Sequence, residues 1–169
     1  LKDHIMANYI IDPSNTSISF YVSYLVIAKV KGDMLSFNGN ISSDLEDFSD
    51  ATIELTLDTN SIFTGIKDRD SHLKSEDFFG TEKFPTAGLV FKTIATKDKN
   101  NYTVTADLTI KGITNTVTFD ININGKVATT KLIVNRAKYD IKYGSGSFFE
   151  NLGDKTIYDE FELDVTLNF

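Results

Sequence analysis

The sequence predicts an all-β protein, an extended eight-stranded antiparallel barrel with one or two short helical segments. Three observations support this prediction. Apolar and polar side chains alternate with a period of two along much of the 169-residue chain, which is typical of strands with one buried and one exposed face. Turn-forming pairs separate the alternating runs. No segment carries an apolar helical stripe longer than two or three turns.

The expected strands follow one another along the chain. The run that begins at Val104 is representative, because Val104, Ala106, Leu108 and Ile110 share one side and polar residues occupy the other. Five runs alternate this clearly and three are weaker. The eight strands are expected at residues 18–23, 33–42, 53–58, 87–96, 104–111, 116–123, 126–135 and 160–169.

The connections between the strands are short and polar. Pairs of the type Lys-Gly and Asn-Gly favour tight hairpin turns because glycine and asparagine accept a positive φ angle. Turns are expected at residues 31–32, 38–39, 97–101, 111–112 and 124–125. Short helices are expected from Asp68 to Phe78 and at residues 145–152.

Strand length favours a closed barrel over a two-sheet sandwich. Residues 156–169 would extend roughly 45 Å at about 3.3 Å per residue. This is longer than a compact sandwich of this size needs. A barrel of eight strands is also wide enough to hold one small ligand inside.

Composition excludes several classes of protein. Seventeen basic residues are scattered among 24 acidic ones, with a net charge of −7, so no nucleic-acid partner is expected. The absence of cysteine excludes disulfides and thiolate metal sites. With two histidines in the chain, neither a metal site nor a catalytic residue is expected.

Residues 1–8 are expected to be an N-terminal tail in front of a single domain at residues 9–169. Two interpretations of the tail remain open. Either a leader was removed before Leu1, which would place the protein in the periplasm or outside the cell, or Met6 is the natural start and LKDHI comes from an expression vector, which would make the protein cytoplasmic. No apolar run reaches the ~20 residues of a membrane-spanning helix.

The stretch GIKDRDSHLKSEDFF at residues 65–79 is unusual for a turn. It contains Arg69, one of two arginines in the chain, and His72, one of two histidines, and it ends on Phe78-Phe79. A segment that covers one end of a barrel would direct Leu73 and Phe78 inward. Arg69 would either pair with a carboxylate and fix this segment, or bind the polar head group of a ligand at the mouth of the barrel.

The order of motifs resembles the YceI-like family, which are lipocalin-like proteins described as polyisoprenoid-binding. The resemblance covers about Tyr9 to Phe169. It rests on the 65–79 stretch with KFP at 83–85, and on IDPSNTSISFYV (11–22), ADLTIKGITNTVTF (106–119) and VNRAKYDI (134–141). The chain departs from the family pattern at Asn15 and Thr16, where the family has His and Ser, and at Tyr24, where it has His. It also lacks the glycine of the later NR-x-DFG motif.

The resemblance implies a barrel that holds a long apolar lipid inside, such as a polyisoprenoid or an isoprenoid quinone. The protein would then be a bacterial carrier or sequestering protein. No cofactor and no catalytic activity are expected. Transient contact with a membrane is also an expectation, and a homodimer is expected because long barrels often pair. Arg136 joins Arg69 and His72 as a candidate for the polar mouth of the site. The apolar lining is expected to comprise Phe20, Leu55, Phe78, Phe91, Leu108, Phe119 and Leu163.

Two other functions remain open. Alternating strands in general are more typical of a solidly packed core than of a cavity, and only the resemblance favours a cavity. With a packed core the protein would be an interaction module that binds no lipid. A small hydrolase is the third possibility, but Asp70, Ser71 and His72 are neighbours in sequence, and such neighbours rarely form a catalytic triad. The glycine-rich GSGSFF at residues 144–149 would be either a flap over the lumen or an interface.

Overall fold

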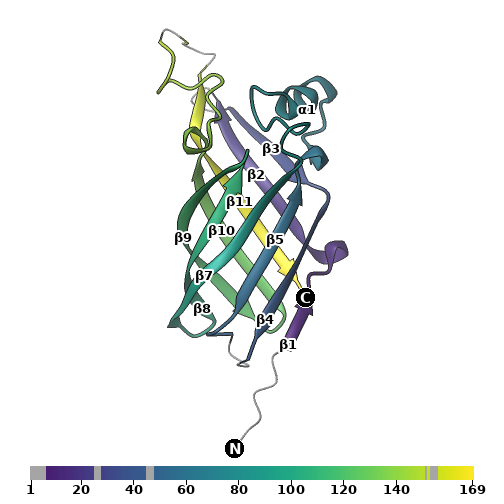
Figure 1. Ribbon diagram of the computed structural model, residues 1–169, viewed down its shortest axis with the longest axis vertical. Coiled ribbons are helices and arrows are strands. Elements are labelled where there is room, and N and C mark those ends of the chain that lie inside the picture. The colour runs from purple at the N-terminus through teal and green to yellow at the C-terminus, as the bar shows by residue number, and fades with distance from the viewer. Residues whose placement is uncertain (1–6, 25–27, 45–47, 151, 153–155) are drawn as a thin grey trace, which may run out of the picture.

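The computed structural model describes residues 7–24, 28–44, 48–150, 152 and 156–169. These residues form one curled antiparallel sheet with a short helix at one end (Figure 1). The strand order is β1-β4-β5-β7-β8-β9-β10-β11-β2-β3-β6. The expected all-β class and the antiparallel barrel are confirmed.

The bounds of the elements are as follows: β1 Ala7–Ile10, η1 Pro13–Asn15, β2 Ser17–Tyr24, β3 Ala28–Met34, β4 Phe37–Ser43, β5 Thr52–Asp58, η2 Thr59–Ser61, β6 Ile62–Phe63, α1 Lys67–Lys74, β7 Thr86–Asp98, β8 Asn101–Ile110, β9 Ile113–Asn124, β10 Val127–Asn135, η3 Arg136–Tyr139 and β11 Ile157–Asn168.

The described residues contain eleven strands rather than eight. Each of the eight expected strands corresponds to an observed one, and β1, β3 and β6 are additional. β1 and β6 have four and two residues, which is too short for an alternation to be recognised. β1 also begins inside the expected N-terminal tail. The strand expected at 33–42 is divided, because β3 ends at Met34 and β4 begins at Phe37.

Two expected turns are wrong, and the reason is the same for both. Gly32 lies within β3 and Gly39 within β4. A Cβ atom at Gly32 would lie 2.0 Å from Cζ of Phe20, and one at Gly39 would lie 2.5 Å from the carbonyl oxygen of Glu54. These glycines therefore allow close packing within strands rather than reversal of the chain. The turns at 97–101, 111–112 and 124–125 are confirmed, with Gly112 and Gly125 at φ angles of 73° and 61°.

The expected helix from Asp68 to Phe78 is present but shorter, since α1 ends at Lys74. Residues 146–148 form a turn, and neither they nor residues 145, 149, 150 and 152 are helical. Residue 151 of that expected helix lies outside the described residues. Asp12, Asp58 and Asn135 cap the three short 3-10 helices with side-chain oxygens.

Two consecutive amides, directly after β1, connect the β1 edge of the sheet to β11. The Ile11 N–H donates to the carbonyl of Gly39 in β4 at 3.1 Å, and the Asp12 N–H donates to the carbonyl of Asn168 in β11 at 2.7 Å. On the other side, the chain passes from β3 to β4 through Leu35 and Ser36. β3 pairs with β2, whereas β4 pairs with β5. The sheet therefore curls around an enclosed interior.

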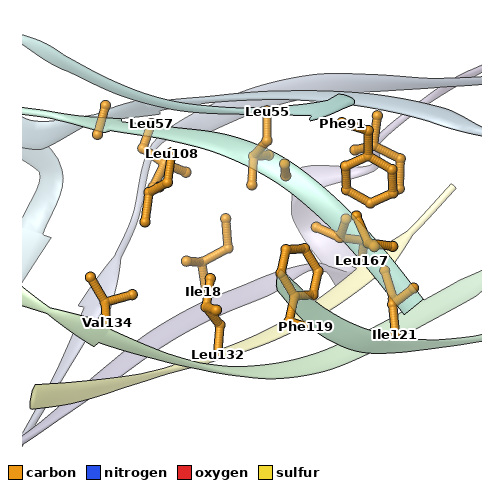
Figure 2. Close-up of a cluster of buried hydrophobic side chains, with 14 of the residues drawn as sticks. Ile18, Leu55, Leu57, Phe91, Leu108, Phe119, Ile121, Leu132, Val134 and Leu167 are labelled. Carbon is orange, nitrogen blue, oxygen red and sulfur yellow. The ribbon is translucent and has the colours of Figure 1, made fainter. Parts of the chain in front are cut away.

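The interior is apolar along the length of the sheet. In β8, every second residue from Tyr102 to Ile110 is buried, as the alternation predicts. Figure 2 shows Leu55, Leu57, Phe91 and Leu108 pointing from one wall toward Ile18, Phe119 and Leu132 on the other. Helix α1 and the segment before β11 lie at one end of the barrel. β1 and the C-terminal residue lie at the other end (Figure 1).

Candidate functional site

An apolar cavity lies at the α1 end of the barrel, and we call it the mouth cavity. Its volume is about 390 Å³, within the range of pockets that hold small organic ligands. Strands β2, β3 and β11 supply one part of its wall, and α1 with the segment after η3 supplies the other. The lining residues are Phe20, Val22, Val30, Arg69, His72, Leu73, Phe78, Phe79, Arg136, Ile141, Tyr143, Ile157 and Phe161.

A second, much smaller space continues the interior toward the other end, and we call it the lower void. Its volume is about 40 Å³, and of its lining residues only Thr130 carries a polar side chain. It has room for a few water-sized groups and no more. A ligand tail could reach this part of the barrel only if the surrounding side chains moved apart.

All ten residues expected to form the site line one of these two spaces. Phe20, Phe78, Arg69, His72 and Arg136 line the mouth cavity. The other five expected apolar residues, Leu55, Phe91, Leu108, Phe119 and Leu163, line the lower void. The sequence prediction thus combined two levels of the barrel into one site.

Arg69 fixes the start of α1 by binding Thr64. Its Nε donates to Thr64 Oγ1 at 2.8 Å, and Nη2 donates to the Thr64 carbonyl at 3.0 Å. Asp70 accepts from the Thr64 amide at 2.9 Å and also from its hydroxyl. Among the described residues Arg69 pairs with no carboxylate, in contrast to the expectation, although the arginine does fix this segment. Nη1 has no hydrogen-bond partner among the described residues, and Arg69 lines the cavity.

His72 belongs to an aromatic cluster over the mouth cavity. Its ring centroid lies 5.0 Å from that of Phe78 and 4.6 Å from that of Tyr143, both in edge-to-face geometry. Such pairs are favourable because the ring edge is positive and the ring face negative. His72 Nε2 lies 2.8 Å from a carboxylate oxygen of Asp77, which orients the imidazole. The cluster joins α1 to the segment that follows η3.

Arg136 uses its guanidinium to bind main-chain carbonyl groups. Only 3% of it is exposed, and its guanidinium donates to four carbonyl groups, those of Ile141, Tyr143, Ile157 and Tyr158, at 2.8–3.1 Å. Burial lowers the pKa of Arg136, and the nearby charge of Asp159 partly offsets this effect. The arginine binds the segment after η3 to the start of β11, and little of its donor capacity remains for a ligand.

The segment that contains GSGSFF is attached to β11 through Asp159. Ser145, which is fully buried, donates its hydroxyl to Asp159 at 2.5 Å, and the hydroxyl of Ser147 donates to the other carboxylate oxygen. Partial burial alone would raise the pKa of Asp159, but the two hydroxyl groups and Arg136 outweigh it and lower the pKa. Phe148 and Phe149 at the end of this segment are 47% and 51% exposed.

Sequence reasoning missed Tyr143, Ile141 and Val30, which also line the mouth cavity. Tyr143 and Ile141 follow the NRAKYD motif, but no periodic pattern marks them as inward-facing. Val30 lies in β3, which the sequence did not predict as a strand. The side chain of Tyr24, where the family motif has a histidine, lies outside the described part of the chain.

Two other kinds of functional feature, a metal site and a membrane-spanning helix, are not found among the described residues. No group of three or more histidine or acidic side chains among them could hold a metal ion. None of the helices formed by these residues has the length and apolar character needed to cross a bilayer. The arrangement that remains is an apolar cavity with a cationic side chain and a histidine at its wall.

Known proteins similar in sequence to this chain belong to one family. Residues 9–169 match the model of a family described as the YceI-like domain. A UPF0312 protein of Staphylococcus aureus strain USA300 is 38% identical over 149 residues, which cover 82% of this chain and 84% of the relative. The corresponding protein of strain MRSA252 is 42% identical over 120 residues, covering 71% of this chain and 67% of the relative.

Two solved structures share the architecture. BcnA of Burkholderia cenocepacia superposes with a TM-score of 0.80 at 24% identity, covering 93% of this chain and 98% of BcnA. A polyisoprenoid-binding domain from Saccharophagus degradans, implicated in plant cell wall breakdown, superposes with a TM-score of 0.70 at 18% identity, covering 96% and 97%. At these identities the likeness is one of fold.

Proposed function

The chain belongs to the YceI-like domain family, and on this premise we propose that it binds an apolar lipid, an isoprenoid or similar molecule, as a carrier or sequestering protein. The observation that carries the proposal is the mouth cavity. It is about 390 Å³ in volume, mostly apolar, and located at one end of the barrel next to a lower void of only about 40 Å³. The polyisoprenoid-binding domain with the same fold supports this choice of ligand.

The lipid would enter with its tail, and its polar group would remain near Arg69. Burial of a methylene group is worth about 0.8 kcal/mol against water, but a membrane solvates the same tail equally well. Discrimination between lipids therefore has to come from polar contacts and from shape. Nη1 of Arg69, which has no partner in the described part of the chain, would donate to a phosphate or carbonyl oxygen, and His72 lines the same cavity. Arg136 is a support for the cavity rather than a ligand contact.

The rim of the mouth would touch the membrane that supplies the lipid. Tyr143, Phe148 and Phe149 are exposed on the segment beside the cavity, and Ile66 is exposed directly before α1. Aromatic side chains of this kind partition into the interfacial region of a bilayer. This contact and the expected homodimer remain predictions. Sedimentation of the protein with and without vesicles tests both.

Native mass spectrometry of protein purified from its own cells tests the proposed function. We expect an adduct whose mass matches that of an isoprenoid lipid and which is released when the protein unfolds. Repeated recovery of the bare protein mass, together with failure to bind added prenyl alcohols, would overturn the proposal.

An interaction module remains the second candidate, because the lower void has a volume of only about 40 Å³. In that case the mouth cavity would stay empty in cells. The same preparation would instead carry a protein partner that dissociates at high ionic strength or in mild detergent.

A further inference from the structure

The mouth cavity ends at the level of Phe20. Phe20 lines this cavity, whereas its cross-strand partner Leu163 lines the lower void. Ile18, which is two residues earlier in β2 and on the same face, also lines the lower void. The ring of Phe20 therefore stands at the border between the open and the nearly filled parts of the barrel.

The ring holds this position because the residue opposite it has no side chain. Phe20 pairs with Gly32 across β2 and β3. A Cβ atom at Gly32 would lie 2.0 Å from Cζ and 2.4 Å from Cε1 of the ring, so the ring occupies the space that any other residue at position 32 would need. Gly32 has no positive φ angle, and its role is to make room rather than to form a turn.

We propose that Phe20, seated on Gly32, sets how deeply an apolar tail enters the barrel and thereby selects ligands by tail length. This inference rests on the proposed function. Removal of the ring would extend the mouth cavity toward Leu163 and the lower void. A methyl group at position 32 would displace the ring from its seat toward the neighbouring open space, which is the mouth cavity, and would shorten the site.

The two changes are expected to act in opposite directions, which makes them a matched pair. The probes are farnesol, geranylgeraniol and solanesol, a series of increasing chain length, and their dissociation constants are measured by competition with a fluorescent fatty acid. For Phe20→Ala we expect the preference to shift toward the longer alcohols, by about tenfold for every two methylene groups newly buried. For Gly32→Ala we expect binding of the longer alcohols to weaken more than that of farnesol.

Two further variants keep the test decisive. Phe20→Leu removes less volume and should shift the preference in the same direction as Phe20→Ala, which covers the case in which the alanine variant does not fold. Ile41→Ala truncates a fully buried residue that lines neither space, so it should lower stability without altering the length preference.

The outcomes separate the inference from the proposed function. If the unaltered protein binds the alcohols and all four variants keep its length preference, Phe20 does not set the depth, while the proposed function stands. If the unaltered protein binds none of the alcohols, the inference is overturned, and the proposed function falls with it when native mass spectrometry also recovers only the bare protein mass. A shift caused equally by Ile41→Ala would also overturn the inference.

Discussion

At the scale of single residues, the two arginines of the chain have different roles although both line the same cavity. Arg136 donates to four main-chain carbonyl groups and is almost wholly buried. Arg69 binds Thr64 through two nitrogens and lines the cavity, and its Nη1 has no hydrogen-bond partner among the described residues. The first arginine is part of the framework and the second is free to meet a ligand. Residue type alone could not distinguish them.

Replacement of Arg136 should strongly destabilise the protein. Arg136→Met removes a buried charge together with its hydrogen bonds to four buried or part-buried carbonyl groups. We expect the free energy of unfolding to fall by about 3–5 kcal/mol. Urea denaturation measures this change. Lys131→Met is the control, because Lys131 is exposed and its Nζ lies 3.9 Å from Oδ2 of Asp164, a long ion pair at the surface. Loss of this pair should lower the free energy of unfolding by less than about 1 kcal/mol. Equal losses for the two variants would contradict the framework role.

Replacement of Arg69 should weaken binding more than it weakens the fold. Arg69→Ala removes the donor at the cavity wall, and we expect affinity for a prenyl phosphate to fall about tenfold or more, as for loss of a charge-assisted hydrogen bond. Thr64→Val is the matched control. It breaks the hydroxyl contact that fixes α1 but leaves the guanidinium in place. If both variants lose affinity equally, Arg69 acts only through the position of α1.

At the scale of elements, the mouth is closed by two segments that the sequence placed only roughly. α1 is a two-turn helix that ends four residues earlier than expected, because Ser75 hydroxyl and amide groups both donate to the carbonyl of His72 and finish the helix there. The segment that contains GSGSFF is neither a helix nor a loose loop. Ser145 and Ser147 bind it to Asp159 on β11, and glycine-rich composition did not reveal this attachment.

The attachment at Asp159 should make this segment sensitive to acid. The pKa of Asp159 is lower in the folded protein than in the unfolded chain, where it is about 3.9. Its stabilising effect is thus present above the unfolded value, and it is lost as the pH falls below that value and through the folded pKa. Amide hydrogen exchange at Phe148 and Phe149, corrected for the intrinsic effect of pH, should show loss of protection over this range.

Asp159→Asn provides the control for this experiment, because an asparagine side chain does not titrate. The variant should show the same weak protection at Phe148 and Phe149 at neutral and acid pH. The amide of Phe79, which donates to the carbonyl of Leu73 on the other side of the mouth, should respond alike in both proteins. An acid response at Phe148 that survives in the variant would contradict the role of Asp159.

At the scale of the whole molecule, binding should raise thermal stability. A ligand that binds only the folded protein adds about 2.7 kcal/mol when its free concentration is one hundred times its Kd. For a domain of this size that corresponds to a rise in Tm of roughly 5–10 °C. Differential scanning calorimetry with geranylgeraniol measures the shift. Octanoate, which offers a carboxylate but only a short tail, is the control and should give a much smaller rise.

Most of the barrel could be predicted from the sequence because its strands obey a local rule. Ile53, Leu55 and Leu57 alternate with polar residues, and the structure buries all three. Gly32 and Gly39 were misread because the space they provide is occupied by Phe20 and by the main chain of β5, which are distant in sequence. The same limit applies to the division of the interior into two spaces, which depends on how side chains from many strands meet.

One further consequence follows from the closure of the barrel by Ile11 and Asp12. The contact of Asp12 with Asn168 holds the end of β11 next to the start of η1. The C-terminal residue Phe169 therefore lies at the end of the barrel opposite α1 (Figure 1). A solid support coupled to Phe169 would hold the opening outward. Immobilised in this orientation on a biosensor chip, the protein could exchange cargo with passing vesicles without steric hindrance from its anchor.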